Sequence, residues 1–196
     1  MNHLAHFHLT GGSEPLVVGA LLGDCIKGPL DGRLSQPLEL GVRLHRRVDA
    51  FMDGHPLLRQ LRSLFPGRER RLAGIVLDMY FDHLLVRHWR RFHERELAHF
   101  SSSIYAILRR NLAQFPASAT HQLGRMIEHD LLNRYGDSSL IDGVLERIGT
   151  RLGQPVAMRA ASARAGGRLD ELEQAFLVFY PEAITMARRM VLSAGR

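Results

Sequence analysis

Cysteine is almost absent from this sequence of 196 residues, in which Cys25 is the single thiol. One cysteine cannot form an internal disulfide, and there is no cysteine cluster to bind zinc or an iron–sulfur centre. Long apolar runs are also missing, because residues 16–22 and 72–77 fall far short of the roughly 20 residues that span a bilayer. The N-terminal segment lacks the basic and apolar regions of a secretory signal. These absences predict a cytoplasmic protein with no membrane segment.

Strand signals are nearly absent as well, since no stretch alternates apolar and polar residues and no Asp-Gly pair joins β-branched runs. Leu, Ala and Arg dominate, and these residues favour helix. We therefore expect an all-α fold that packs residues 1–196 into a single compact domain. The stretch 157–167 is either a connection or a weak helix, and Ser139 with Asp142 has the spacing of a capping box. Helices are predicted over residues 2–9, 13–27, 37–52, 56–65, 68–92, 94–115, 117–135, 139–152 and 169–193.

The charge is basic, at +6 with histidines neutral. A basic surface attracts an anionic partner, which can be a nucleic acid, a membrane or an acidic protein. The basic residues are spread along the chain and form no tail, and the sequence lacks a nucleic-acid reading motif. This distribution disfavours a nucleic-acid partner.

Common catalytic signatures are missing too: there is no phosphate-binding Gly-rich loop, no dinucleotide fingerprint, no Ser elbow and no His-Glu-x-x-His. The chain has one literal His-Asp pair, His129–Asp130, which lies in a polar stretch. We interpret that pair as incidental.

Acidic residues do occur where burial is expected. Residues 75–85 are apolar nearly all round and predict a buried helix, yet they include Asp78, Asp82 and His83. Asp78 and Asp82 are four residues apart and share one helix face. Two buried carboxylates need a cationic partner. That partner is either a set of arginines or a divalent metal, and Asp and His ligands suit Mn, Mg, Fe or Zn.

A second stripe lies on the helix predicted over 37–52, where His45, Asp49 and Asp53 recur every four residues. The ordinary interpretation is a solvated face with ion pairs. The neighbouring Arg46 and Arg47 could instead clamp a phosphate. Two further candidates stand apart: Asp24 ends an apolar run, and His6 belongs to a histidine cluster that also contains His3 and His8.

In combination and order, several segments resemble the acyl carrier protein phosphodiesterase family. They are residues 2–9, 19–28, 41–49, 53–56, 77–83, 87–89 and 176–181.

The resemblance implies hydrolysis of the phosphodiester that joins 4′-phosphopantetheine to a serine of holo-acyl carrier protein. It also implies a relation to HD-type metal phosphohydrolases, HD-like helix packing and a divalent cation, which is Mn²⁺ with Mg²⁺ or Fe²⁺ as alternatives. This chain has Asp82–His83 where the family relation would predict the reverse order. Acyl carrier protein, which is acidic, would be the partner of the basic surface.

From the residues and the resemblance together, we predict His83 or His55 as the acid for the leaving oxygen and Arg46 and Arg47 as phosphate ligands. Two alternatives remain: a related phosphohydrolase acting on a nucleotide or another small phosphoester, and a non-enzymatic basic binding module. The predicted metal-site residues are His6, Asp24, His45, Asp49, Asp78 and Asp82.

Overall fold

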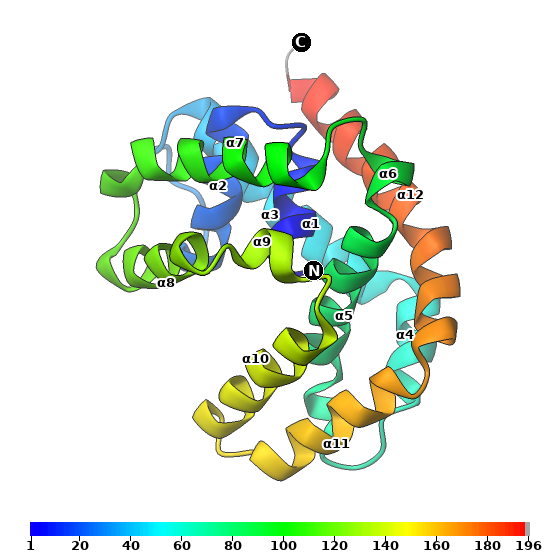
Figure 1. Ribbon diagram of the computed structural model, residues 1–196. Coiled ribbons are helices and arrows are strands. Elements are labelled where there is room, and N and C mark those ends of the chain that lie inside the picture. Colours follow the sequence, from blue (N-terminus) through cyan, green and yellow to red (C-terminus); the bar gives the residue numbers. More distant parts are fainter. Residues whose placement is uncertain (195–196) are drawn as a thin grey trace.

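Helices are the only regular elements of the computed structural model, which describes residues 1–194 (Figure 1). The all-α prediction is therefore confirmed for this part of the chain. The elements are α1 (His3–Leu9), α2 (Glu14–Cys25), α3 (Gln36–Gly54), α4 (Pro56–Ser63), η1 (Glu69–Arg71), α5 (Ala73–Arg87), α6 (Trp89–Phe92), α7 (Leu97–Arg110), η2 (Leu112–Gln114), α8 (Ala117–Glu128), α9 (Leu131–Arg134), α10 (Ser138–Arg151), α11 (Pro155–Gly166) and α12 (Leu169–Ala194).

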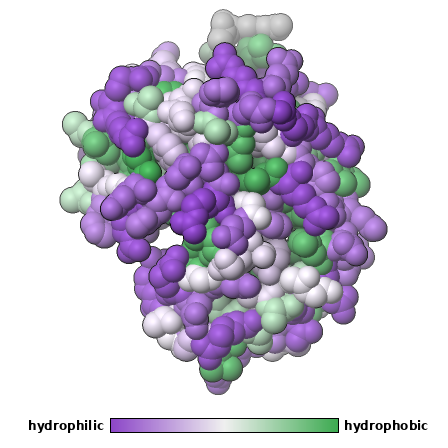
Figure 2. All heavy atoms as spheres, in the orientation of Figure 1, coloured by the Kyte–Doolittle hydropathy of each residue, from purple (hydrophilic) through white to green (hydrophobic). Residues whose placement is uncertain are grey.

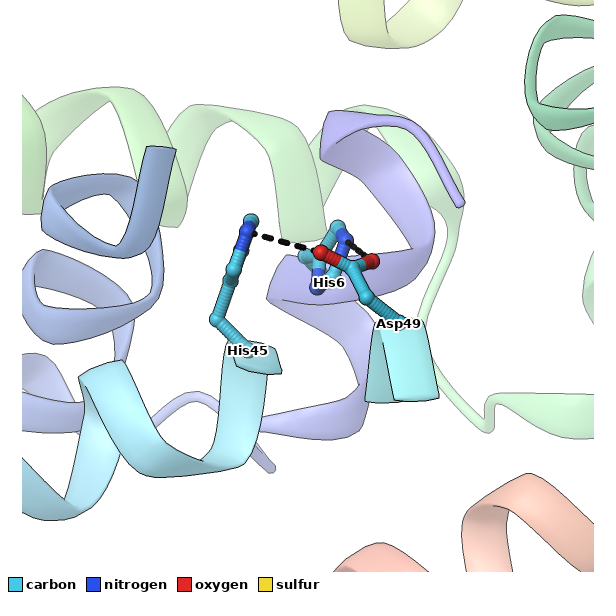
Figure 3. A group of neighbouring side chains, drawn as sticks. All are labelled: His6, His45 and Asp49. Atoms are coloured by element: carbon cyan, nitrogen blue, oxygen red, sulfur yellow. Dashed lines mark ion pairs between the residues drawn. The ribbon is translucent and has the colours of Figure 1, made fainter. Parts of the chain in front are cut away.

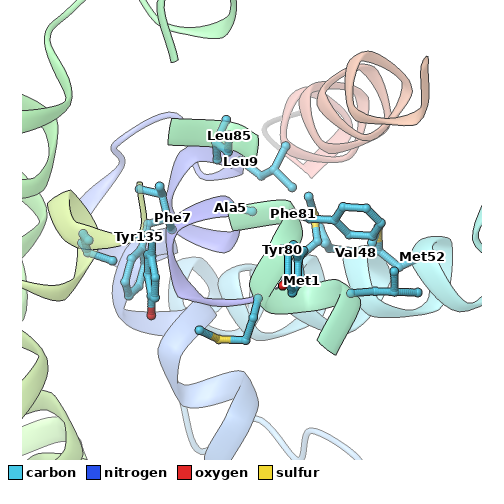
Figure 4. Close-up of a cluster of buried hydrophobic side chains, with 14 of the residues drawn as sticks. Met1, Ala5, Phe7, Leu9, Val48, Met52, Tyr80, Phe81, Leu85 and Tyr135 are labelled. Carbon is cyan, nitrogen blue, oxygen red and sulfur yellow. The ribbon is translucent and has the colours of Figure 1, made fainter. Parts of the chain in front are cut away.

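Helix α5 runs through the middle of the molecule, as its nearly uniform apolar character predicts. Phe81, Leu84 and Leu85 are fully buried, and α1, α10, α11 and α12 all pack against the helix. Side chains from α1, α3 and α5 meet in one core cluster that includes Ala5 and Val48 (Figure 4). The short α1 therefore lies inside the fold.

Helices α2 and α3 make the most extensive helix pair of the fold. Glycine allows this approach: a Cβ on Gly19 would lie 2.3 Å from the Leu38 carbonyl oxygen, and one on Gly41 would lie 2.7 Å from the Leu16 carbonyl oxygen. Both distances are shorter than a side-chain carbon tolerates. The close pairing brings the end of α2 against the middle of α3, where the histidine and aspartate stripe lies.

Most predicted helices exist, but several have different boundaries. The predicted helix over 117–135 is interrupted at Asp130, which adopts a left-handed conformation with φ 47°. The small-residue stretch 157–167 lies mostly within α11, which starts at Pro155. The capping-box prediction at Ser139 is wrong, because Asp137 precedes α10 and its carboxylate accepts the Ser139 N–H at 2.9 Å.

Helix α12 has 26 residues and lies along α3, α4 and α5 (Figure 1). Phe176, Phe179 and Tyr180 are its fully buried aromatic residues, and they pack around Phe81 and Phe92. No helix within residues 1–194 has an apolar stretch long enough to cross a membrane.

His8 joins α1 to α12 inside the core. Its Nδ1 lies 2.8 Å from the Tyr180 hydroxyl and its Nε2 lies 3.2 Å from the Phe92 carbonyl oxygen. A carbonyl only accepts, so Nε2 must carry the proton and Tyr180 must donate to Nδ1. This arrangement needs the neutral ring, and burial lowers the pKa of His8 to about 4.

The His8 contacts predict a loss of stability in acid. The folded pKa of about 4 is below the usual 6.5, so the folded state binds fewer protons and the free energy of unfolding falls as the pH drops from about 6.5 to 4. The contribution of His8 is about 3 kcal/mol. Urea unfolding of metal-free protein across this range should show a weaker pH dependence in His8→Gln than in the wild type. The exposed control His121→Gln should keep the wild-type dependence, and an unchanged slope in His8→Gln would contradict the assignment.

Candidate metal centre

Two helices bring His6, His45 and Asp49 together (Figure 3). The Asp49 carboxylate contacts one nitrogen of each ring, with His6 Nε2 3.2 Å from Oδ1 and His45 Nε2 3.2 Å from Oδ2. The rings are stacked, with centroids 4.1 Å apart. The three residues each offer a ligand atom, and these atoms all lie within 4.8 Å of one another. We call these three residues the His-His-Asp cluster.

Local sequence explains the geometry. His45 and Asp49 are four residues apart on α3 and so face the same direction, whereas His6 comes from α1. Gly23 on α2 makes room for the His45 ring, because a Cβ at that position would lie 2.5 Å from His45 Cγ. A glycine at residue 23 is therefore required for His45 to take this position.

The cluster has unsatisfied polar atoms. His6 and His45 are only 6% and 5% exposed. Within residues 1–194, Nδ1 of His6 and Nδ1 of His45 have no hydrogen-bond partner, and the 3.2 Å contact of His6 Nε2 with Asp49 lacks the angles of a hydrogen bond. Buried polar atoms without partners are costly. A bound cation would use the nitrogen lone pairs, so the residues present fit a divalent metal of the kind that accepts imidazole and carboxylate ligands.

The protonation states suit the same ligand. Burial lowers the pKa of His6 to about 4, which keeps its ring neutral at pH 7. Burial alone would raise the pKa of Asp49, but its contacts with His45 and His6 and the nearby positive N-terminus hold it well below the usual range. A neutral imidazole and an ionised carboxylate are the forms that bind metals.

Asp78 and Asp24 lie at the edges of the cluster. Asp78 pairs with the buried amino group of Met1 at 3.0 Å, and this amino group is also 3.8 Å from Asp49. Asp24, at the end of α2, lies 3.6 Å from His45 Nε2 and 3.9 Å from His3 Nδ1. Five of the six predicted metal-site residues therefore belong to one connected group of charged contacts, in which Asp78 is joined to Asp49 through the Met1 ammonium. His3 was not among the predicted residues, although its three-residue spacing from His6 places both on one face of α1.

Asp82, the sixth predicted residue, is engaged elsewhere. Its carboxylate is fully buried and accepts the Leu4 N–H at 2.8 Å and the Ala5 N–H at 3.1 Å. These N–H groups belong to the first turn of α1 and have no acceptor within the helix. Burial raises the pKa of Asp82 to about 7 despite these hydrogen bonds. Asp82 thus fixes the helix that carries His6.

Arginine does not pair with either aspartate of the buried helix within residues 1–194: the partners of Asp78 and Asp82 are an ammonium group and two backbone amides. The alternative of a purely arginine-paired helix is therefore wrong for this part of the chain. On α3, the last residue of the predicted stripe, Asp53, is exposed and pairs with Arg62 of α4.

The structure does not bring the two predicted acids to the cluster. His83 Nδ1 lies 3.0 Å from the Tyr135 carbonyl oxygen. His55 precedes α4, accepts the Leu57 N–H and lies 3.4 Å from Glu182. Arg46 donates to the Ile26 carbonyl oxygen at 2.8 Å, close to Asp24 in the chain, whereas Arg47 lines a groove between α3 and α12.

The sequence model of the family described as "Acyl carrier protein phosphodiesterase" matches residues 1–183. The chain belongs to this family. Relatives with that name include proteins from Serratia proteamaculans, 31% identical over 96% of this chain and 98% of the relative, and from Pectobacterium atrosepticum, 30% identical over 98% and 100%. A relative from Escherichia coli O127:H6 is 31% identical over 98% of this chain and 100% of its own. No solved structure matches this acyl carrier protein phosphodiesterase family member.

The cap on α1 leads to a test of stability. Asp82→Ala should lower the free energy of unfolding by about 3 kcal/mol, because two buried N–H groups lose a charged acceptor. Asp82→Asn keeps one acceptor oxygen and should lose less. The matched control is Asp137→Ala, which removes an exposed cap and should cost about 1 kcal/mol. Urea unfolding at pH 8 measures all three, and equal losses in Asp82→Ala and Asp137→Ala would refute the role of Asp82.

The His-His-Asp cluster leads to a test of metal binding. Titration calorimetry with MnCl₂ should show one binding event that weakens at least about tenfold in His45→Ala and in Asp49→Asn, since each removes a ligand. The thermal midpoint of the wild type should rise with Mn²⁺, because a ligand that binds only the folded state stabilises it. The control His121→Ala should bind as the wild type does. Unchanged affinity in both cluster variants would show that the metal binds elsewhere.

Proposed function

We propose that this chain is an acyl carrier protein phosphodiesterase that hydrolyses the phosphodiester between 4′-phosphopantetheine and a carrier-protein serine. Water adds across the P–O bond, so the products are apo-carrier protein and free 4′-phosphopantetheine. The observation that carries the proposal is the buried His-His-Asp cluster within a chain that matches the family over residues 1–183.

We propose that the reaction depends on a divalent metal, with Mn²⁺ as the first candidate and Mg²⁺ or Fe²⁺ as alternatives. His6, His45 and Asp49 would hold the ion, and Asp24 and Asp78 are the further carboxylates around it. A metal bound there would supply a Lewis acid for the phosphoryl oxygens and lower the pKa of a water molecule. The stacked rings and the α1 cap hold the ligands in place before substrate arrives.

We assign the two arginines to different tasks. Arg46 is anchored on the Ile26 carbonyl oxygen through one Nη. Its remaining N–H groups can hold a non-bridging phosphate oxygen, because a guanidinium carries five donors. Arg47 lies instead on the groove that also contains Met186 and Arg189. There its charge suits the surface of the acidic carrier protein, which would be steered toward a basic face.

The proton for the leaving serine oxygen needs a donor. A role for His83 or His55 stays a prediction, since each requires substrate to reach a ring that lies away from the cluster. His3 is beside Asp24 at the cluster edge and partly exposed, so we add it as a third candidate.

The remaining parts of the proposal rest on the family resemblance and on the composition. We propose a single domain whose helix packing is related to HD-type metal phosphohydrolases, and a cytoplasmic location where reduced Cys25 is stable.

The experiment is mass spectrometry of holo-acyl carrier protein incubated with the chain and Mn²⁺. We expect the mass of 4′-phosphopantetheine to be lost from the carrier protein, with EDTA abolishing the loss. Asp49→Asn should slow it at least about 100-fold, because it removes a charge at the proposed metal site. The control His121→Ala should react as the wild type does.

An intact holo-protein after incubation of folded chain with Mn²⁺, Mg²⁺ and Fe²⁺ in turn would refute the proposal. Turnover in a parallel panel of nucleotides would then support the related phosphohydrolase instead.

A further inference from the structure

A second feature of the surface is a cavity of about 770 Å³ between the end of α1 and helices α6, α7 and α12. We call it the arginine pocket, because Arg90, Arg91, Arg95 and Arg188 line it. None of the residues of the His-His-Asp cluster belongs to its lining. The volume is in the range of small-molecule sites.

The charge of the arginine pocket is strongly unbalanced. Arg90 pairs with Glu96, but no carboxylate of residues 1–194 forms an ion pair with Arg91, Arg95 or Arg188. Glu94 is the acidic residue in the lining. Three guanidinium groups around one concave site form the arrangement that binds phosphate through several N–H groups at once.

The positive charge of the arginine pocket also acts on His8, a buried histidine in the pocket lining. Burial is the main cause of the lowered pKa of His8, and the positive charge of Arg188 contributes to it. Both ring nitrogens of His8 are already bonded, to Tyr180 and to the Phe92 carbonyl oxygen. His8 is therefore a fixed, neutral part of the pocket wall.

Part of the pocket lining is apolar, and we call this part the apolar floor. Ile104 and Phe100 are buried, and Phe92 and Ile184 are partly exposed. In Figure 2, hydrophilic side chains surround apolar ones over the region where α6 and α12 lie side by side in Figure 1. A cationic rim over an apolar floor suits a ligand with an anionic head and an apolar body.

We propose that the arginine pocket is a second binding site that takes an organic phosphate. Arg91, Arg95 and Arg188 hold the phosphate group, and the apolar floor around Ile184 and Phe92 covers the organic part. The site is separate from the proposed metal centre and does not need a metal ion. A concave site of this size favours a small molecule over a protein surface, which would need a flatter and larger contact.

Titration calorimetry with metal-free full-length chain in EDTA tests the proposal, because EDTA removes any contribution of the metal centre. The probes are inorganic pyrophosphate, ADP and 4′-phosphopantetheine. We expect at least one organic phosphate to bind more tightly than pyrophosphate. The double variant Arg91→Gln, Arg188→Gln should weaken binding at least about tenfold, since two charged donors are lost. Ile184→Ala should weaken the organic phosphate but leave pyrophosphate unchanged.

The matched control is Arg125→Gln with Arg151→Gln, which removes two exposed arginines that form no ion pair within residues 1–194. It should bind as the wild type does, and thermal unfolding checks that every variant is folded. If both double variants lost the same affinity for the organic phosphate, the loss would be due to net charge alone, and the proposal would be overturned. So would pyrophosphate binding as tightly as every organic probe, or no binding at millimolar concentration. Loss of carrier-protein binding alone in the Arg91 and Arg188 variant would assign the pocket to protein docking and also overturn it.

Discussion

The hydrogen bonds from the first turn of α1 to the Asp82 carboxylate are the interaction on which the core and the His-His-Asp cluster both depend. A helix as short as α1 is unstable in isolation, and its first N–H groups are buried away from water. Asp82 supplies acceptors for two of them from inside α5. Because α1 carries His6 toward α3 and His8 toward α12, one cap fixes the position of a metal-centre residue and of a core contact.

Asp78 and Asp82 lie one helical turn apart on a buried helix, where two carboxylates would repel each other. In the structure, each carboxylate has a positively charged or partly positive partner of its own. Asp82 meets backbone amides, which carry partial positive charge at a helix start. Asp78 meets the ammonium group of Met1. The pKa of Asp78 is raised by burial even with that contact. The ammonium group therefore does not fully offset the cost of burying the ionised Asp78 carboxylate.

The helices and two of the three cluster residues, His45 and Asp49, could be predicted from spacing, whereas His6 was predicted from the histidine-rich N-terminal segment. His45 and Asp49 share a face at four residues apart, and that relation needs no tertiary information. The choice between Asp78 and Asp82 could not be made, because the two share one face of α5 and which of them meets the start of α1 depends on where along α5 that short helix packs. The break at Asp130 could not be predicted from the sequence pattern either. Its left-handed backbone conformation leaves the spacing of apolar and polar residues in the sequence unchanged.

The local charge around the cluster is opposite to that of the whole chain. Asp24 and Asp49 lie within 4 Å of His45 Nε2, and Asp78 is linked to Asp49 through the Met1 ammonium group, whereas the chain carries +6. An anionic phosphodiester approaching these carboxylates would be repelled. The Met1 ammonium offsets part of this charge, and a divalent cation held by the cluster, as proposed above, would offset the rest. With that cation in place, an acidic interior and a basic exterior would be compatible with one anionic substrate.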